Sequence, residues 1–195
     1  MISERGFEGG AARSISTSHL IDQVGKAHGR EVEEVPVGFK YIGKQLAEGA
    51  IAMGGEESGG MSIRGHVPEK DGILACLLVC EMRARRGKSL QALLEDLWER
   101  VGKRVSSRLN IPFMAPQRAA IEARLADPPK TLAGRAVERV SDRGGLKLYL
   151  ENEAWFMVRL SGTEPMVRLY AESHDEKDLA KIIEAGRKFL LGSLV

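Results

Sequence analysis

The first half of the chain alternates between runs of apolar residues with helical spacing and runs with strand-like spacing. Residues 17–29 and 39–49 repeat apolar positions every three or four residues, which predicts two short helices. Residues 30–38 alternate apolar and polar side chains up to Pro36, and residues 50–55 form a short apolar run, so both are expected to be strands. Such alternation of strands and helices is typical of an α/β domain.

Two longer helices are expected to complete this domain. Residues 72–86 are apolar around most of a helix's circumference, which is typical of a central, buried helix. The chain's two cysteines, Cys76 and Cys80, lie on this helix and are expected to be buried small hydrophobes. A zinc site would need about four ligands at metal-binding spacing. Residues 89–102 predict an amphipathic helix that ends the domain near residue 103.

The second half of the chain has a different pattern, in which strands follow one another. After a strand or extended linker at 104–113 and a helix at 115–127, four strand-like runs are expected at 136–142, 146–152, 153–160 and 166–173. A last helix is expected to begin at Ser173, with Glu176 completing a capping box. We therefore expect an α/β domain over 1–103, with helices on the faces of a mixed sheet, and a small α+β domain with an antiparallel sheet over 104–195.

Composition and charge narrow the function classes. The 195 residues are 43% hydrophobic and 29% charged, with a net charge of +2, as in ordinary soluble proteins. There is no concentrated basic stripe of the kind that binds nucleic acid. No apolar run approaches the ~20 residues that span a bilayer, and residues 1–10 lack the apolar segment of a signal peptide. We expect a cytoplasmic protein that binds neither nucleic acid nor membrane.

The turn between the last two strands, RLSGTEP at 159–165, carries groups that suit a phosphate. Arg159 offers a planar fork of donors, and Ser161 and Thr163 offer hydroxyls. Gly162 is expected to let successive backbone N–H groups turn toward one anion, and Arg168 adds a second cation on the returning strand. Turns favour Gly and Ser in any case, so composition alone leaves a plain hairpin turn as an equal alternative.

A second loop, GGEESGG at 54–60, follows a buried strand. In α/β proteins ligands bind beyond the carboxyl ends of strands. If the loop is extended, Glu56 and Ser58 point the same way, and a carboxylate with a hydroxyl suits the hydroxyl pairs of a sugar. A flexible surface turn is the alternative.

Two further loops carry candidate polar groups. Asp71 is expected to cap the helix at 72–86, with Lys70 beside the helix start. His66, in the same loop, is a candidate proton carrier or hydrogen-bond donor. Gly38 and Lys40 are candidates to line the same cleft. Residues 16–19, STSH, lack the flanking glycine turn of a nucleophilic serine loop, so they are interpreted as a helix start.

In their order along the chain, these four loops resemble the third and fourth domains of the α-D-phosphohexomutases, the phosphoglucomutase and phosphomannomutase family. The matching motifs are PVGFKYI, GGEESGG, PEKDG followed by an apolar helix, and RLSGTEP followed by VRLY. They cover almost the whole chain. Together they resemble the phosphoglucomutase branch more than the phosphoglucosamine branch.

The resemblance implies an intramolecular phosphotransferase, an isomerase in which a phosphoserine and a bisphosphate intermediate exchange a phosphoryl group with a hexose phosphate. Matched position by position, it implies three sets of residues. Sugar-binding residues would be Glu56, Ser58, Gly38 and Lys40; phosphate-binding residues would be Arg159, Ser161, Gly162, Thr163 and Arg168; Lys70 and His66 would assist catalysis.

The sequence departs from the family at the parts that do the chemistry. The family's serine loop and aspartate-rich magnesium loop lie in its first two domains, and nothing here corresponds; residues 141–145 have too few carboxylates to bind Mg²⁺. We therefore expect the substrate-holding part of a larger Mg²⁺-dependent mutase. Its partners would be the hexose phosphate and the missing N-terminal domains, and it would be inactive alone. The alternatives are a stand-alone phosphosugar-binding module, or a fragment of a phosphomannomutase or phosphoglucosamine mutase.

Overall fold

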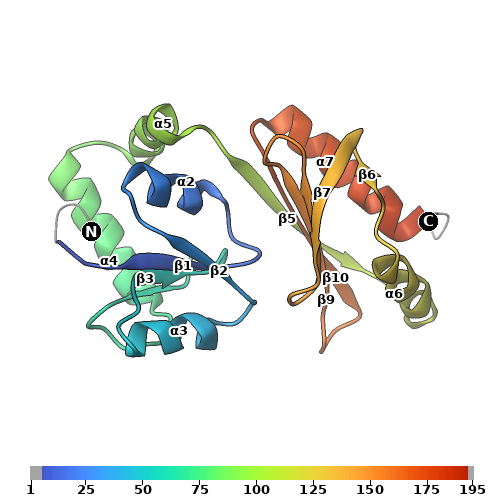
Figure 1. The fold of residues 1–195 in the computed structure, drawn as a ribbon, viewed down its shortest axis with the longest axis horizontal. Coiled ribbons are helices and arrows are strands. Elements are labelled where there is room, and N and C mark those ends of the chain that lie inside the picture. Colours follow the sequence, from blue (N-terminus) through green and yellow to red (C-terminus); the bar gives the residue numbers. More distant parts are fainter. Residues whose placement is uncertain (1–5, 193–195) are drawn as a thin grey trace. The chain divides into compact units, whose positions relative to one another are not determined.

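The computed structural model describes residues 6–192, which fall into two compact units divided between Lys103 and Arg104. Each unit has its own sheet and its own helices (Figure 1). Within the described residues, no helix is both long and apolar enough to cross a membrane.

The first unit is built on a four-stranded mixed sheet with the order β2-β1-β3-β4. Its strands are β1 (Gly10–Ser14), β2 (Val32–Val35), β3 (Ile51–Gly55) and β4 (Met61–Ile63). β1, β2 and β3 run parallel, and β4 pairs antiparallel with β3. Helices α2 (Leu20–Ala27) and α3 (Phe39–Ala47) lie on opposite faces of this sheet (Figure 1). The mixed sheet with helices confirms the predicted α/β class, although β1 and β4 were not predicted.

Close packing of α3 against the sheet forms the small core of this unit. The core consists of Ala12, Val35, Phe39, Ile42, Leu46 and Ile51. A Cβ on Gly54 would come within 2.4 Å of the Ile42 side chain, so only glycine fits beneath the helix at that point of β3. This contact fixes the end of β3, and with it the start of the loop that follows.

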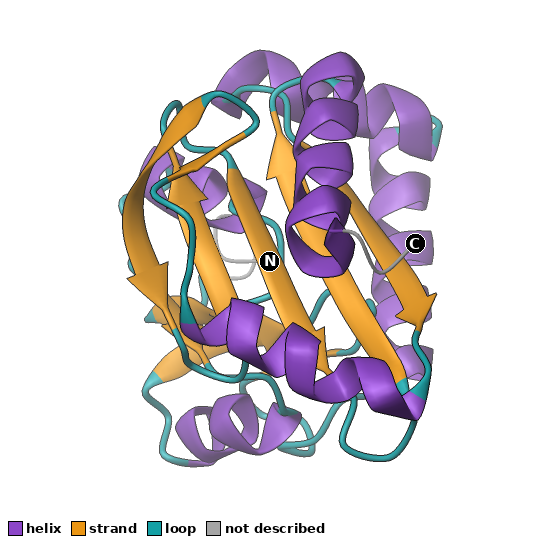
Figure 2. Cartoon of the chain, turned by 90° about the vertical axis from the view of Figure 1, so that its right-hand side faces the viewer, coloured by secondary structure: helices purple, strands orange, loops and turns teal. Residues whose placement is uncertain are grey.

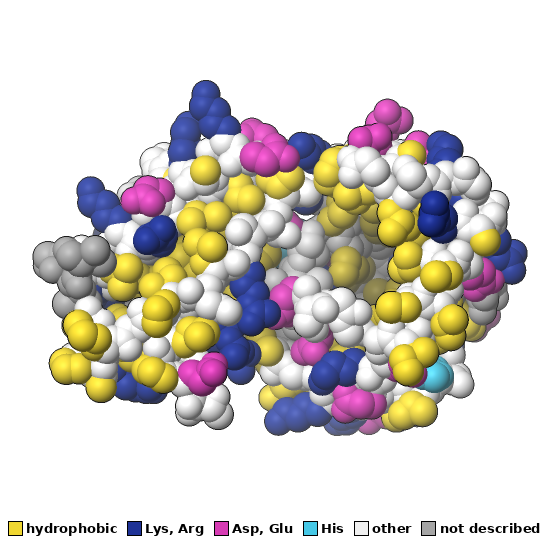
Figure 3. Space-filling view, turned by 180° about the vertical axis from the view of Figure 1, so that it is seen from behind, with side chains coloured by type: hydrophobic (Ala, Val, Ile, Leu, Met, Phe, Trp, Pro, Cys, Tyr) yellow, Lys and Arg dark blue, Asp and Glu magenta, His cyan; other side chains and the backbone are white. Residues whose placement is uncertain are grey.

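The long helix α4 (Gly72–Arg86) has the predicted ends, but the prediction that it is buried was wrong. Ile73 is 76% exposed and Leu77 62%, and both cysteines are exposed rather than buried. Among the described residues α4 packs against β4, the edge strand of the sheet, so much of its apolar circumference has no neighbour. Figure 3 shows many hydrophobic side chains on the surface of this unit. α5 (Leu90–Val101) follows and contacts α2.

The second unit is a six-stranded antiparallel sheet with the order β5-β10-β9-β8-β7-β6. Its strands are β5 (Val105–Pro112), β6 (Thr131–Leu132), β7 (Arg135–Ser141), β8 (Leu146–Leu150), β9 (Trp155–Leu160) and β10 (Met166–Ser173). A short 3-10 helix, η1 (Ala115–Gln117), leads into α6 (Arg118–Ala126), and α7 (Glu176–Leu191) ends the unit. α6 and α7 cover the same face of the sheet (Figure 2). The predicted small α+β unit with an antiparallel sheet is confirmed.

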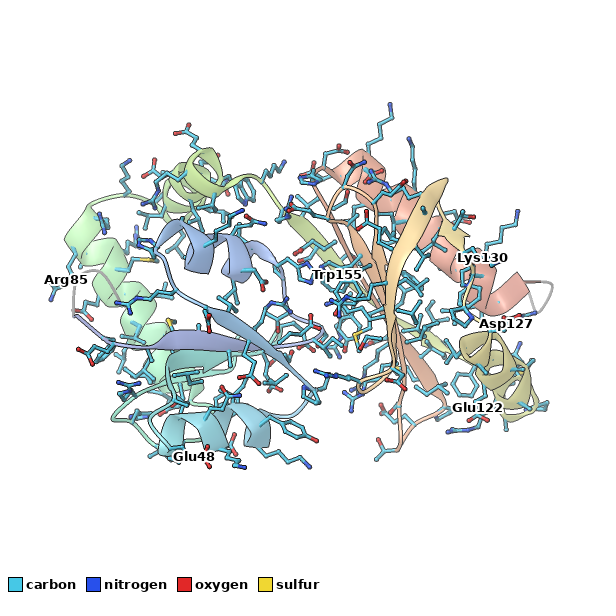
Figure 4. The ribbon with its side chains drawn as sticks, in the orientation of Figure 1. Glu48, Arg85, Glu122, Asp127, Lys130 and Trp155 are labelled. Carbon is cyan, nitrogen blue, oxygen red and sulfur yellow. The ribbon has the colours of Figure 1, made fainter. Side chains whose placement is uncertain are left out.

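Side chains alternate between the two faces of this sheet. Phe156 and Val158 point into the core beneath α7. Trp155, the neighbour of Phe156 on β9, lies on the other face (Figure 4). Its Nε1 donates a hydrogen bond of 3.0 Å to Glu172. Because side chains alternate along a strand, Arg159 on β9 shares the face of Trp155.

The start of α7 differs from the prediction. Ser173 ends β10, where it pairs with Val105, so it cannot also open the helix. Asp175 is the N-cap instead, and its Oδ1 accepts the backbone N–H of Asp178 at 2.8 Å.

The Asp178 carboxylate itself accepts hydrogen bonds from the Ser173 hydroxyl and from Arg135. Burial acts to raise the pKa of Asp178, but these two hydrogen bonds, together with the charges of Arg135 and Lys181, outweigh it and lower the pKa below the ordinary carboxyl value. The contact therefore stabilises the fold above the pKa of the unfolded carboxyl, and this contribution is lost as the pH falls through the lower folded value.

Candidate functional site

The carboxyl edge of the first unit's sheet gathers most of the predicted polar loops. β1, β2 and β3 are parallel, so their carboxyl ends, at Ser14, Val35 and Gly55, lie at one edge. The segments that follow these strands are residues 15–19, 36–38 and 56–60. The structure thus brings together three loops that are spread over more than forty residues of chain.

The loop after β3 is a closed turn. The backbone N–H of Glu56 donates to the Gly60 carbonyl at 2.9 Å, and the N–H of Gly59 donates to the Glu56 carbonyl at 3.0 Å. The premise of an extended loop was therefore wrong, because backbone hydrogen bonds close it on itself. Glu56 is half-buried, and its Oε1 accepts the N–H of Gly38 at 3.1 Å; Ser58 is exposed.

The backbone conformation of Gly38 favours glycine at this position. Its φ of 125° lies in a region that side chains rarely adopt, and it is the N-cap residue of α3. The hydrogen bond from Gly38 to Glu56 ties the start of α3 to the loop after β3. Lys40, in the first turn of α3, is exposed, with its Nζ 5.0 Å from the Tyr41 ring centroid.

The loop leading into α4 packs against the same edge. A Cβ on Gly60 would lie 3.0 Å from Lys70 Cδ, so the Lys70 side chain covers this glycine. The Lys70 Nζ lies 5.7 Å from the Phe39 ring centroid, and the Asp71 N–H donates to the Met61 carbonyl at 3.0 Å. The exposed ammonium of Lys70 is thereby placed beside the loop at 54–60.

Asp71 caps α4, as predicted. Its Oδ1 accepts the N–H groups of Ile73 at 2.8 Å and Leu74 at 3.0 Å. The Oδ2 lies 2.9 Å from Nε2 of His66. The hydrogen bond from Leu74, followed by that from His66, lowers the pKa of Asp71. His66 thus belongs to the network that holds this cap.

The sequence interpretation missed a buried hydroxyl cluster in this edge. Ser14, Ser16 and Thr17 are each at most 5% exposed, and Glu57 Oε2 accepts hydrogen bonds from Ser14 and Ser16. Residues 16–19 had been interpreted only as a helix start. The signal that could have identified the cluster is the run of hydroxyl residues at the end of a short strand of small residues, and that strand, β1, was itself missed.

A buried ion cluster lies next to these hydroxyls. Arg13, on β1, is 3% exposed and forms hydrogen-bonded ion pairs with Asp22 of α2, at 2.5 Å, and with Glu34 of β2, at 3.0 Å. Burial acts to lower the pKa of Arg13, but Asp22 and Glu34 raise it above its ordinary value. The pairs join α2 and β2 to the end of β1, which makes this end of the strand a firm support.

The hairpin between β9 and β10 brings two arginines together in the second unit. Arg159 and Arg168 are directly opposite each other in the register of the two strands. Like charges in such a pair destabilise a sheet unless an anion compensates them. The Nε of Arg168 is buried and has no hydrogen-bond partner among the described residues. An anion at this point would satisfy both the charge and the unpaired donor.

The turn itself presents hydroxyls and an open glycine. Ser161 is 5% exposed, its Oγ lies 3.5 Å from Thr163 Oγ1, and it accepts the N–H of Glu164 at 3.3 Å. The backbone bends over residues 162–165, and Gly162 does so without a left-handed φ, so its convergence of N–H groups on an anion stays a prediction. A Cβ at this position would meet nothing within 4 Å. Gly162 leaves room in front of the turn.

The described residues do not fit a divalent-cation site. Across residues 6–192, no group of three or more His, Cys, Asp or Glu side chains is placed to hold a metal ion. The polar groups of the first unit's edge are hydroxyls and carboxylates, and those of the second unit's hairpin are guanidinium groups with hydroxyls.

Two family models match the chain. The phosphoglucomutase/phosphomannomutase alpha/beta/alpha domain III matches residues 2–101, and the phosphoglucomutase/phosphomannomutase C-terminal domain matches residues 117–188. The phosphoglucomutase of Komagataeibacter xylinus is 32% identical over 95% of this chain and 36% of its own length. Human phosphoglucomutase-1 is 30% identical over 89% of this chain and 35% of its own length.

A solved structure agrees with these matches. A protein from Thermus thermophilus, named as a phosphomannomutase, superimposes with a TM-score of 0.78 and 31% identity, over 97% of this chain and 38% of that one. The chain spans about a third of the length of these relatives. It belongs to the phosphoglucomutase/phosphomannomutase family, and it corresponds to the third and C-terminal domains of that family.

Proposed function

We propose that this chain is the substrate-holding part of a phosphohexomutase that interconverts glucose 1-phosphate and glucose 6-phosphate. Family membership supports the reaction class, and the phosphoglucomutases among the relatives favour glucose. In this reaction an enzyme phosphoserine gives its phosphoryl group to the sugar phosphate. The bisphosphate then turns around, and the other phosphate returns to the serine.

One observation carries this proposal: Arg159 and Arg168 face each other across the strands, and the buried Nε of Arg168 has no hydrogen-bond partner in the part of the chain that the structure describes. A phosphate dianion accepts forked hydrogen bonds from guanidinium groups and cancels their repulsion. Ser161 and Thr163 add hydroxyl donors, and Gly162 leaves room for the ligand. We assign to this hairpin the phosphate that is not reacting.

The carboxyl edge of the first unit is assigned to the sugar. Glu56 and Ser58 would hydrogen-bond to ring hydroxyls, with Gly38 and Lys40 beside them. A grip on hydroxyls serves both orientations of the sugar, because it does not depend on which end carries the reacting phosphate. Lys70, which lies against Gly60, would supply a positive charge on the substrate side. His66 would assist by holding Asp71, next to Lys70 in the chain.

The nucleophile and the metal are assigned to parts of the whole protein outside residues 6–192. One structural neighbour, an Aspergillus fumigatus N-acetylphosphoglucosamine mutase, was solved in complex with GlcNAc-6P and magnesium. Because the described residues do not supply a metal site, we propose that Mg²⁺ would be held by N-terminal domains. Phosphoryl transfer depends on positioning and on charge neutralisation around a nucleophile.

A turnover assay tests whether the nucleophile and the metal site lie outside this chain. The purified 195-residue chain is expected to form no glucose 6-phosphate from glucose 1-phosphate, even with glucose 1,6-bisphosphate and Mg²⁺ present, because it would lack the phosphoserine and the metal site. Conversion above the protein-free control would contradict the proposal. The stand-alone binding module is distinguished by the upstream coding region: serine and aspartate-rich loops there favour the mutase, and their absence favours the module.

A further inference from the structure

We propose that Glu57 is a positioning residue that fastens the loop after β3 to the loop after β1, and thereby holds Glu56 and Ser58 in place for the sugar. The inference rests on the proposed sugar-binding role of those two residues. Glu57 itself does not touch the substrate in this proposal. It acts through the two hydroxyl groups that it binds.

The contacts of Glu57 are specific. Its Oε2 accepts a hydrogen bond from Ser16 Oγ at 2.9 Å and another from Ser14 Oγ at 3.2 Å. Ser14 Oγ also lies 2.8 Å from Thr17 Oγ1, so the hydroxyls form a connected cluster. A carboxylate accepts hydrogen bonds only, and serine hydroxyls can rotate to donate to it. Such charge-assisted hydrogen bonds are stronger than those between neutral groups.

The other end of this link is rigid. Ser14 is the last residue of β1, and in the sheet it pairs with Val35 of β2. Its neighbour Arg13 is fixed by the ion pairs with Asp22 and Glu34. The loop that Glu57 fastens is joined by backbone hydrogen bonds mainly to itself. A side-chain link to β1 therefore limits how far this loop can move relative to the sheet.

The two adjacent carboxylates have different tasks. Glu56 accepts the N–H of Gly38, on the side of α3, whereas Glu57 binds the hydroxyls after β1. The turn at 56–60 is thus held by consecutive side chains that reach two different neighbouring loops. Releasing one of them allows the backbone to rotate, and this displaces both Glu56 and Ser58.

Affinity measurements on three variants test the inference. Glu57→Ala is expected to weaken binding of glucose 1-phosphate to the full chain by about tenfold or more, the usual effect of losing a charged hydrogen-bonded link. Affinity for inorganic phosphate should change by less than about twofold. Glu57→Gln keeps an oxygen acceptor and should restore affinity to within about threefold of the parent. Glu48→Ala removes an exposed carboxylate at the end of α3 (Figure 4) and serves as the matched control.

Hydrogen exchange of the ligand-free chain separates this inference from the proposed function. Glu57→Ala should speed amide exchange of Glu56, Gly59 and Thr17 together, whereas Glu57→Gln and Glu48→Ala should not. If exchange responds but the parent does not bind glucose 1-phosphate, the link stands and the proposed function fails. Unchanged exchange in Glu57→Ala overturns the link, whatever the ligand result.

Ser16→Ala tests the same link if Glu57→Ala does not fold. Ser16→Ala removes the shorter of the two hydrogen bonds and leaves the carboxylate in place. It is expected to give the same pattern with a smaller effect, about three- to tenfold on glucose 1-phosphate. If Ser16→Ala leaves both exchange and affinity at parent values, the inference is wrong.

Discussion

Arg168→Ala is expected to weaken the binding of glucose 1-phosphate by about 10- to 150-fold, which corresponds to ~1.5–3 kcal/mol for a lost hydrogen bond to a charged group. The reason lies in the hairpin: Arg168 faces Arg159 across the strands, and its buried Nε has no partner among the described residues. Isothermal titration calorimetry at fixed salt measures the effect. Fixed salt matters because screening weakens exposed charge interactions.

Two further variants identify the chemistry behind this effect. Arg168→Lys keeps the charge but not the planar fork of donors, so it should recover only part of the affinity. Arg187→Ala removes an arginine from the exposed side of α7 in the same unit and should leave the affinity unchanged. If Arg168→Ala binds glucose 1-phosphate as well as the parent, the assignment of the hairpin to phosphate is wrong.

Gly186→Ala is expected to destabilise the second unit by about 1–3 kcal/mol, the usual cost of overpacking a core. A Cβ at this position of α7 would lie 2.0 Å from Cε2 of Phe156, whose ring is completely buried. Without a clash the substitution would stabilise the helix, because alanine is favoured over glycine in a helix by about 1 kcal/mol. A loss of stability therefore indicates overpacking. Chemical denaturation of the parent and the variant measures the difference.

A double-mutant cycle assigns this cost to the ring. In a Phe156→Leu background the clashing ring atoms are absent, so Gly186→Ala should be neutral or should stabilise by up to about 1 kcal/mol. A gain in stability from Gly186→Ala in the parent background would show that α7 does not approach β9 as closely as the structure has it.

Local patterns were sufficient to predict most elements but not their burial. The apolar runs and caps predicted the ends of α4 and the turn between β9 and β10. α4 was predicted to be buried because its circumference is apolar, yet burial depends on which elements surround a helix, and α4 packs on an edge strand. Ser173 was chosen as a cap because serine favours caps, but strand pairing with Val105 takes that residue.

The candidate site was predictable where the residues are near each other in sequence. The hairpin arginines follow from a turn between two strands, since side-chain alternation places them on one face. The link from Glu57 to Ser14 and Ser16 joins residues about forty positions apart, and it depends on the parallel register of β1 and β3. No local pattern contains that register, so this part required the fold.

The most direct test of the two assigned loops is a titration of the isotope-labelled parent chain with glucose 1-phosphate, followed by the backbone amide signals in NMR spectra. We expect saturable shifts of amides 54–60 in the first unit, which is assigned to the sugar, and of amides 161–168 in the second, which is assigned to the phosphate. Inorganic phosphate should shift only the second group. If glucose 1-phosphate shifts neither group, the assignment of these loops to the sugar and the phosphate is wrong.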